Sequence, residues 1–121
     1  TQSWTAINHK GDGHHSHIHP NTVFSCVYYV QANSGDLQIK MPVSRIQEGY
    51  NLSYNVVQQN IFNSRTINLS VKTGDMVIFP GWCEHQALPN ENDEARIILG
   101  TNYFLTGTFG DYENKDQIHI T

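Results

Sequence analysis

The sequence predicts an all-β fold, a double-stranded β-helix (a cupin-like jelly roll) with little helix. Short runs rich in β-branched and aromatic residues, many with alternating apolar and polar positions, recur along the chain. Clusters of Gly, Asn, Asp and Pro separate these runs, as expected for turns. No window carries a capped apolar stripe with the helical period, so we expect at most a turn or two of helix.

Each expected strand is such a run, and turn residues divide them. Asn33-Ser34-Gly35 follows the longest run, Thr73-Gly74-Asp75 precedes the run that starts at Met76, and Pro89-Asn90-Glu91-Asn92-Asp93 precedes the last one. The segment Pro42–Asn51 has the weakest pattern, and the polar tail after Gly107 is expected to be peripheral. In chain order, the expected strands are Ser3–Asn8, Thr22–Gln31, Asp36–Lys40, Tyr54–Ile61, Thr66–Val71, Met76–Phe79, His85–Leu88 and Arg96–Phe104.

Many short strands without helices indicate a sandwich or barrel, and the jelly roll best buries both faces of its sheets in this length. The interior of such a barrel can hold a ligand or a metal. The expected core comprises Val27, Tyr28 or Tyr29, Leu37, Ile39, Leu69, Val77, Phe79, Ile97 and Leu99.

Length and charge narrow the class of protein. With 121 residues, the sequence fits one domain, residues 1–121, and is too short for a two-domain enzyme. The formal net charge of −4 lacks the basic excess that nucleic acids attract, so we expect no nucleic-acid partner. No apolar run approaches the roughly 20 residues of a membrane span, and no basic-then-apolar leader opens the chain. We expect no membrane association, a cytoplasmic location and, as one option, a homodimer.

The two cysteines, Cys26 and Cys83, are too few for a disulfide framework and do not form a C-x-x-C motif. One disulfide between them is possible, but buried free thiols are the favoured interpretation.

The histidines are unevenly distributed, since five of the seven lie within the first 19 residues. His17 and His19 form an H-x-H pair, and on extended backbone such a pair projects from one face and can hold one ion. His85 follows an apolar run and a Pro-Gly turn, and can add a third imidazole from another strand. Imidazole suits Fe(II), Zn, Cu or Ni, so the ligand type alone does not select the metal.

Simpler interpretations of these histidines stay open. A His-rich stretch can be a solvated tract that binds metal adventitiously, and a lone histidine such as His85 is often structural. We expect His14 and His15 to lie behind the ligands or in a solvated loop. His9 and His119 are given no role.

The order of several segments resembles the 2-oxoglutarate/iron(II) dioxygenases, from Trp4 to about Phe104. The segments that carry the resemblance are Trp4-Thr5-Ala6-Ile7-Asn8, Gly11, His17-Ile18-His19-Pro20-Asn21, Ser25-Cys26-Val27-Tyr28-Tyr29-Val30, Gly35-Asp36-Leu37, Gly74-Asp75-Met76-Val77-Ile78-Phe79-Pro80, His85-Gln86-Ala87-Leu88-Pro89-Asn90 and Arg96-Ile97-Ile98-Leu99-Gly100-Thr101-Asn102.

The resemblance implies an Fe(II) site and 2-oxoglutarate as co-substrate, with Zn or Ni able to occupy the site after purification. It assigns His17 and His85 to the metal and Arg96 to the far carboxylate of 2-oxoglutarate. Tyr29 matches a tyrosine that hydrogen-bonds the same carboxylate in some relatives. The implied reaction hydroxylates an unidentified small-molecule or peptide substrate and releases succinate and CO₂. For Arg96, a salt bridge with Glu91, Asp93 or Glu94 is the alternative.

One residue departs from the family pattern, because His19 stands where the family usually has an acidic ligand. A neutral imidazole there leaves the metal site one unit more positive. We expect His19 to be the third ligand, with Asp12 and Glu84 as candidate substitutes; Glu84 should face away from His85 on the same extended strand.

Two other functions fit parts of the pattern. A cupin-like metalloenzyme that does not use 2-oxoglutarate shares the jelly roll and the histidines, but the Glu expected shortly after His19 is absent and such an enzyme has no need of Arg96 or Tyr29. A non-catalytic jelly roll that binds a metal or small ligand is the third option. Fe(II)-dependent turnover of 2-oxoglutarate distinguishes the three.

Overall fold

The computed structural model describes residues 1–51, 55–113 and 115–121, and for residues 44–46 it describes the backbone alone. Almost all of the regular structure is strand, as predicted. The elements are β1 (Gln2–Asn8), β2 (His14–His17), β3 (Phe24–Gln31), β4 (Leu37–Lys40), α1 (Pro42–Gly49), β5 (Thr66–Leu69), β6 (Met76–Pro80), β7 (His85–Ala87), β8 (Arg96–Tyr103), β9 (Gly107–Phe109) and β10 (Ile118–Ile120).

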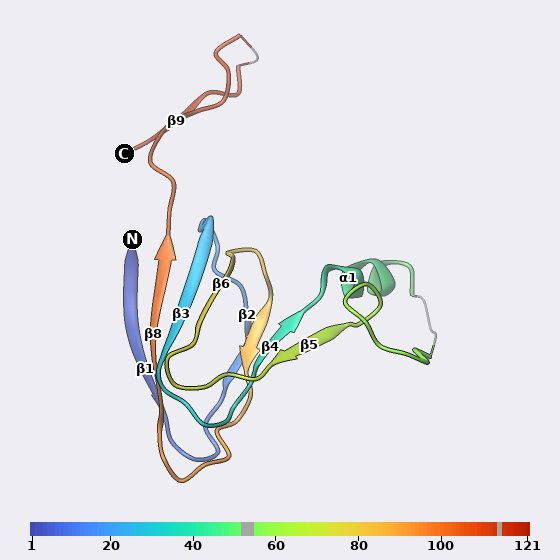
Figure 1. Cartoon of the computed structure of the whole chain (residues 1–121). Coiled ribbons are helices and arrows are strands. Elements are labelled where there is room, and N and C mark those ends of the chain that lie inside the picture. Colours follow the sequence, from blue (N-terminus) through green and yellow to red (C-terminus); the bar gives the residue numbers. More distant parts are fainter. Residues whose placement is uncertain (52–54, 114) are drawn as a thin grey trace.

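Two antiparallel four-stranded sheets face each other across the core (Figure 1). One has the order β1-β8-β3-β6 and the other β2-β7-β4-β5, so strands that are distant in sequence become neighbours. This alternation of strands between two sheets confirms the predicted jelly roll. It also brings β2 and β7, which carry the predicted metal ligands His17 and His85, side by side.

Apolar side chains from both sheets form the core. Most members of the expected core are confirmed, including Tyr29, Leu37 and Phe79. Burying one such side chain stabilises the fold by about 1.5–3 kcal/mol. The buried cluster is Tyr29, Ala32, Leu37, Val71, Phe79 and Cys83, with Val27, Ile39, Leu69, Val77 and Ile98 packed against it.

The prediction that Ile97 and Leu99 belong to the core was wrong, because it assigned the odd-numbered positions of β8 to the inner face. Arg96 and Asn102 on this strand are buried, and Ile98 packs on the core between them. Since side chains alternate between the two faces of a strand, an inward Arg96 turns the odd-numbered positions outward. Leu99 is therefore exposed and Ile97 only half-buried.

The strand predicted over Tyr54–Ile61 is also wrong where it can be judged, since residues 55–61 are not in a strand and residue 54 lies outside the described residues. Side-chain amides hold a tight turn here instead: the Asn60 backbone N–H donates to Asn63 Oδ1 at 2.8 Å, and Phe62 N–H donates to Asn60 Oδ1 at 2.8 Å. Such Asx turns compete with sheet pairing.

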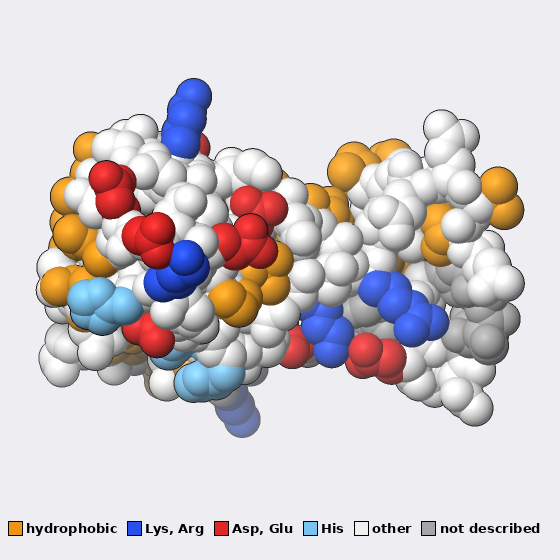
Figure 2. Space-filling view, turned by 90° about the horizontal axis from the view of Figure 1, so that it is seen from below, with side chains coloured by type: hydrophobic (Ala, Val, Ile, Leu, Met, Phe, Trp, Pro, Cys, Tyr) orange, Lys and Arg blue, Asp and Glu red, His pale blue; other side chains and the backbone are white. Residues whose placement is uncertain are grey.

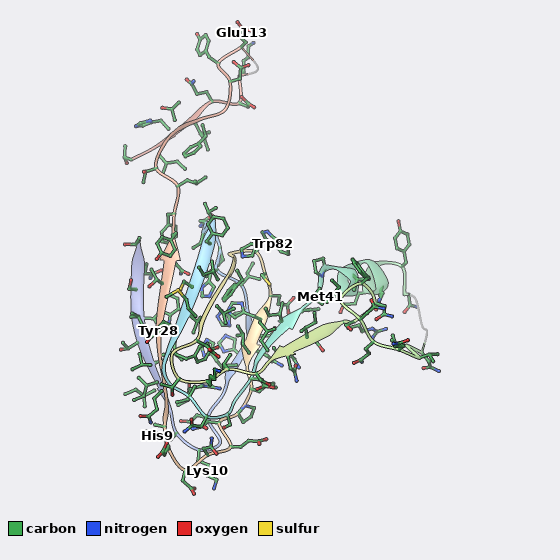
Figure 3. The ribbon with its side chains drawn as sticks, viewed as in Figure 1. His9, Lys10, Tyr28, Met41, Trp82 and Glu113 are labelled. Carbon is green, nitrogen blue, oxygen red and sulfur yellow. The ribbon has the colours of Figure 1, made fainter. Side chains whose placement is uncertain are left out.

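Four elements were not predicted as such: the short strand β2, the helix α1, and the strands β9 and β10 of the tail. Helix α1 is eight residues long, about two turns, which agrees with the expected small helix content. Its first residue is Pro42, a favoured first helical position. The tail forms the β9–β10 hairpin, which projects from the end of β8 and carries Glu113 near its tip (Figures 1 and 3).

The outer face of the β1-β8-β3-β6 sheet is apolar, and Figure 2 shows hydrophobic side chains gathered along that side of the molecule. Tyr28 points outward there (Figure 3). The inner face of the same sheet carries polar groups, among them Ser25, Arg96 and Asn102. These polar groups lie on the same face as core side chains such as Tyr29 and Ile98, and polar groups buried in this way call for a function. The exposed apolar residues are Ile7, Phe24, Tyr28, Val30, Met76, Ile78, Leu99 and Tyr103.

Cys26 and Cys83 are both buried free thiols, as favoured, and burial raises the pKa of each. No helix in the described part of the chain is both long and apolar enough to cross a membrane.

Adjacent residues of β6 provide a test of this core. Phe79 is 4% exposed and Ile78 is 64% exposed on the opposite face of the strand. Phe79→Ala should lower the free energy of unfolding by about 3–5 kcal/mol, because it removes buried surface and leaves a cavity. Ile78→Ala should cost less than half as much. Urea unfolding followed by fluorescence measures both, and equal costs would contradict the assignment of inner and outer faces.

Candidate functional site

A cavity of about 350 Å³ lies between the two sheets. Its walls carry histidines from the β2–β7 side and Arg96, Tyr29 and Asn102 from the opposite sheet. Apolar side chains such as Leu37 and Ile98 complete the wall. The jelly roll thus places the sequence-predicted site residues around one space of the size that small ligands occupy.

Three of the predicted ligands meet at this cavity. The ligand nitrogens of His17, His19 and His85 all lie within 4.8 Å of one another. His17 pairs directly with His85 across the β2–β7 ladder. His19 lies two residues further on, and its backbone N–H donates to the carbonyl of Gly81 at 2.9 Å. The H-x-H spacing and one strand pairing therefore build the cluster.

Backbone carbonyls fix the ring orientation of two of the three histidines. His17 Nδ1 lies 2.8 Å from the carbonyl oxygen of His15, and His85 Nδ1 lies 2.8 Å from that of Cys83. A neutral imidazole that donates from Nδ1 to a carbonyl keeps the Nε2 lone pair free for a metal. His19 has no such carbonyl; its Nδ1 is 3.4 Å from the amide nitrogen of Asn102.

Burial favours, for two of the three histidines, the uncharged state that a metal requires. Burial, together with the smaller effects of the neighbouring His17, His19 and His14, lowers the pKa of His85 to about 4, against the opposing effect of the hydrogen bond to Cys83. Burial, followed by the charges of His17 and His14, also lowers the pKa of His19. His19 and His85 are consequently neutral at pH 7 and able to coordinate.

Neither acidic substitute joins the cluster. Asp12 Oδ2 accepts a hydrogen bond from the His9 backbone N–H at 2.9 Å. Glu84 accepts one from the Ser16 hydroxyl at 3.0 Å and pairs with Lys40 at 3.5 Å. Among the described residues, the metal-competent groups around the cavity consist of histidines alone.

The other two histidines of β2 lie at the rim. His14 lines the cavity, whereas His15 is exposed and stacks near His14 at a ring distance of 4.6 Å. Together with His17 they form a second group whose ligand atoms lie within 4.8 Å. His17 belongs to both groups, so one of its nitrogens cannot bind a metal ion in each group at the same time.

Arg96 is buried without an acidic partner. Its side chain is held by oxygen acceptors: Nη1 donates to the carbonyls of Gly35 at 2.5 Å and Leu88 at 2.9 Å, and Nη2 donates to Asn8 Oδ1 at 3.3 Å. Arg96 is 2% exposed, and in the described part of the chain no carboxylate forms a salt bridge with it. The predicted alternative, a salt bridge to Glu91, Asp93 or Glu94, is therefore wrong.

Gly35 is required for this arrangement. Its φ of +81° lies in the left-handed region, and a Cβ at this position would overlap Nη1 of Arg96. Any side chain here would push the guanidinium away from the carbonyls that hold it.

Of the two candidate tyrosines, Tyr29 faces the cavity and Tyr28 faces outward. Burial raises the pKa of Tyr29 to about 12, although the positive charge of Arg96 acts in the opposite direction. Its phenol therefore stays protonated and can donate a hydrogen bond to a ligand.

The sequence analysis missed the polar groups that surround the predicted residues, above all Asn8, Ser25 and Asn102. A signal for Asn102 was present, because it lies an even number of residues from Arg96 on one strand and so shares its face. No comparable signal existed for Asn8, whose role depends on where the Arg96 side chain ends.

Comparisons with known proteins agree with this geometry. A family model described as "Putative 2OG-Fe(II) oxygenase" matches residues 2–102. Among solved structures, a prolyl-4-hydroxylase from Pseudomonas putida shares the fold with a TM-score of 0.58 and 15% sequence identity, over 85% of this chain and 51% of that chain. The chain thus spans about half the length of that structure. No curated protein matches the chain in sequence.

The low pKa of His85 predicts how stability depends on pH. The folded protein takes up this proton only near pH 4, whereas the unfolded chain takes it up near pH 6.5. The unfolded state therefore binds more protons between these values, so metal-free protein should gain stability as pH rises from about 4 to 6.5. The midpoint of urea unfolding, measured across this range, should rise less steeply in His85→Gln. The exposed His119→Gln serves as the control, and an unchanged slope in His85→Gln would contradict the prediction.

Proposed function

Because the chain belongs to the 2OG-Fe(II) oxygenase family, we propose that it is an Fe(II)- and 2-oxoglutarate-dependent dioxygenase that hydroxylates a substrate and releases succinate and CO₂. Fe(II) and 2-oxoglutarate are the metal and the co-substrate of this family. The substrate class expected from the sequence, a small molecule or a peptide, belongs to the same proposal.

One observation carries this proposal: a buried guanidinium without a carboxylate partner faces the cavity that holds the three histidines. A buried charge is costly unless it is paired. A ligand that brings an anion to Arg96 supplies the missing partner, and the planar guanidinium suits a carboxylate. The C5 carboxylate of 2-oxoglutarate meets this requirement.

The donor set fits an iron ion. His17 and His85 present nitrogen ligands from two adjacent strands, His19 adds a third from the segment after β2, and all three line the cavity. Imidazole also binds Zn and Ni, so either metal can occupy the site after purification. Bound Fe(II) would supply the oxidative chemistry, using O₂ and the electrons released by decarboxylation of 2-oxoglutarate.

Each protein group then has a definite task. The three histidines hold the metal, and the carbonyls of His15 and Cys83 keep two of the rings aligned. Arg96 binds the far carboxylate of the co-substrate, and the protonated Tyr29 hydroxyl donates a second hydrogen bond to it. Apolar neighbours such as Leu37 and Ile98 line the same cavity, and polar contacts are stronger beside apolar side chains than in bulk water.

The placement of the two groups also suits a dicarboxylate. Arg96 and the three histidines line the same cavity, so one ligand can meet the guanidinium with one carboxylate and a metal held by the histidines with the other. In a cupin-like enzyme that does not use 2-oxoglutarate, Arg96 would have no co-substrate carboxylate to bind.

Removing a ligand tests the metal site. His85→Ala and His17→Ala should each abolish stoichiometric Fe(II) binding at neutral pH, because two imidazoles and water hold the ion weakly. His9→Ala, which changes a histidine outside the cluster, should retain one Fe(II) per chain. Anaerobic equilibrium dialysis with iron analysis gives the stoichiometry. Tight binding of one Fe(II) by His85→Ala would disprove this ligand set.

Replacing the anchor tests the co-substrate site. Arg96→Met should weaken 2-oxoglutarate binding by about 2–5 kcal/mol and leave Fe(II) binding intact, because it removes the charge from a buried ion pair. Anaerobic titration of 2-oxoglutarate into the Fe(II) protein follows the visible charge-transfer band. Arg65→Met is the matched control, since Arg65 bonds Gln47 away from the cavity.

Succinate production decides whether the protein is an oxygenase. The native protein should convert 2-oxoglutarate to succinate in the presence of Fe(II) and O₂, even slowly and without a prime substrate. If neither succinate nor the charge-transfer band is detected, the oxygenase proposal fails. If native protein and Arg96→Met bind 2-oxoglutarate equally well, Arg96 is not the anchor.

A further inference from the structure

We propose that Asn102 is a positioning residue that sets the tautomer and ring orientation of His19, and that Ser25 in turn holds Asn102. This inference rests on the proposed metal site and adds to it a residue that acts through His19. It explains how the histidine that replaces the usual acidic ligand is oriented.

The three histidines differ in what faces Nδ1. For His17 and His85 the partner is a backbone carbonyl two residues earlier, at 2.8 Å in both cases. These contacts belong to the strand itself and need no particular side chain. His19 alone depends on a side chain, the amide of Asn102, at 3.4 Å.

Asn102 is built into the opposite sheet and is only 6% exposed. Its Oδ1 lies 2.7 Å from the hydroxyl of Ser25, a residue that is 1% exposed, and its Nδ2 lies 3.4 Å from Gln2 Oε1. A buried amide requires partners for both its oxygen and its nitrogen. Residues of β1, β3 and β8 thus converge on His19, which follows β2 in the other sheet.

The direction of the amide determines whether His19 can coordinate through Nε2. With the amide nitrogen toward Nδ1, Asn102 donates to His19, and the ring proton must then sit on Nε2. With the amide turned by half a rotation, Oδ1 accepts a hydrogen bond from Nδ1–H and the amide nitrogen donates to the Ser25 hydroxyl, which can accept as well as donate. The exposed Gln2 amide must then turn as well, so that its nitrogen, and not Oε1, faces Asn102 Oδ1. Only the second arrangement leaves Nε2 free for a metal, so we infer that it is the arrangement of the metal-bound protein.

Substitutions of Asn102 separate a positioning role from a purely structural one. Asn102→Leu removes the acceptor and should weaken Co(II) binding about 10- to 100-fold, the usual effect of losing a partner behind a histidine ligand. Asn102→Asp keeps an acceptor oxygen, loses the amide donor and adds a negative charge behind His19, so it should bind Co(II) at least as tightly as the native protein. Asn90→Asp, the same change at another buried asparagine, is the control and should leave Co(II) affinity unchanged.

Proton NMR of the Co(II) protein supplies a readout that fold stability alone does not move. Each bound imidazole with a protonated Nδ1 gives one exchangeable, paramagnetically shifted N–H signal, so the native protein should show three. Asn102→Leu should lose the signal that His19→Ala removes, or exchange it with water much faster, and keep the other two. Ser25→Ala should speed exchange of that same signal to a smaller degree.

The outcomes are distinguishable. Native protein with three signals, together with Asn102→Leu that keeps all three at native affinity, would overturn the role of Asn102 and leave the metal site intact. Native protein with only two signals would show that His19 is not a ligand through Nε2, and would overturn the proposed triad itself. Weak binding by both Asn102→Leu and Asn102→Asp would overturn the acceptor role, because the acceptor is lost in only one of them.

Discussion

The guanidinium of Arg96 is buried between two sheets and held by oxygens that carry no full charge, those of Gly35, Leu88 and Asn8. These dipoles satisfy its hydrogen bonds without neutralising it. Burial accordingly lowers the pKa of Arg96 from its ordinary value, as expected for a cation in a poor solvent. Such an arrangement sacrifices stability, and it is consistent with a site that an anionic ligand completes.

The inward direction of Arg96 also organises β8 and what packs on it. Every second residue beyond it faces the interior, which brings Ile98 to the core and Asn102 to His19. Gly100 occupies the intervening inward position, where any Cβ would overlap the ring of Trp4 on β1. A shift of β8 by one residue would expose the Arg96 guanidinium and bury Leu99. One strand register therefore determines the position of Arg96, the packing of Trp4 on Gly100 and the contact of Asn102 with His19.

The fold was predictable because it depends on local patterns, and the histidine spacing indicated a cluster, whereas the roles expected of Arg96 and Tyr29 were implied by the resemblance to a family. Alternation marked most strands, and H-x-H spacing placed His17 and His19 on one face. The errors arose where side chains act at a distance or override propensity. Asparagine side chains turned residues 55–61 into a loop, and the destination of the long Arg96 side chain determined the use of Asn8 and Gly35. Sequence periodicity specifies the face from which a side chain leaves, but not the groups it reaches.

The replacement of an acidic ligand by His19 changes the charge balance of the whole cavity. Three neutral imidazoles contribute no negative charge to a divalent ion, and Arg96 adds a positive charge in the same cavity. Asp12 and Glu84, the nearby acids considered from sequence, are engaged elsewhere. In the proposed metal site, the ligand would therefore supply the negative charge at both ends, which favours a molecule with two carboxylates over a monoanion of similar shape. A neutral acceptor such as Asn102 behind His19 leaves the excess of positive charge in the cavity unchanged, whereas an aspartate there would reduce that excess.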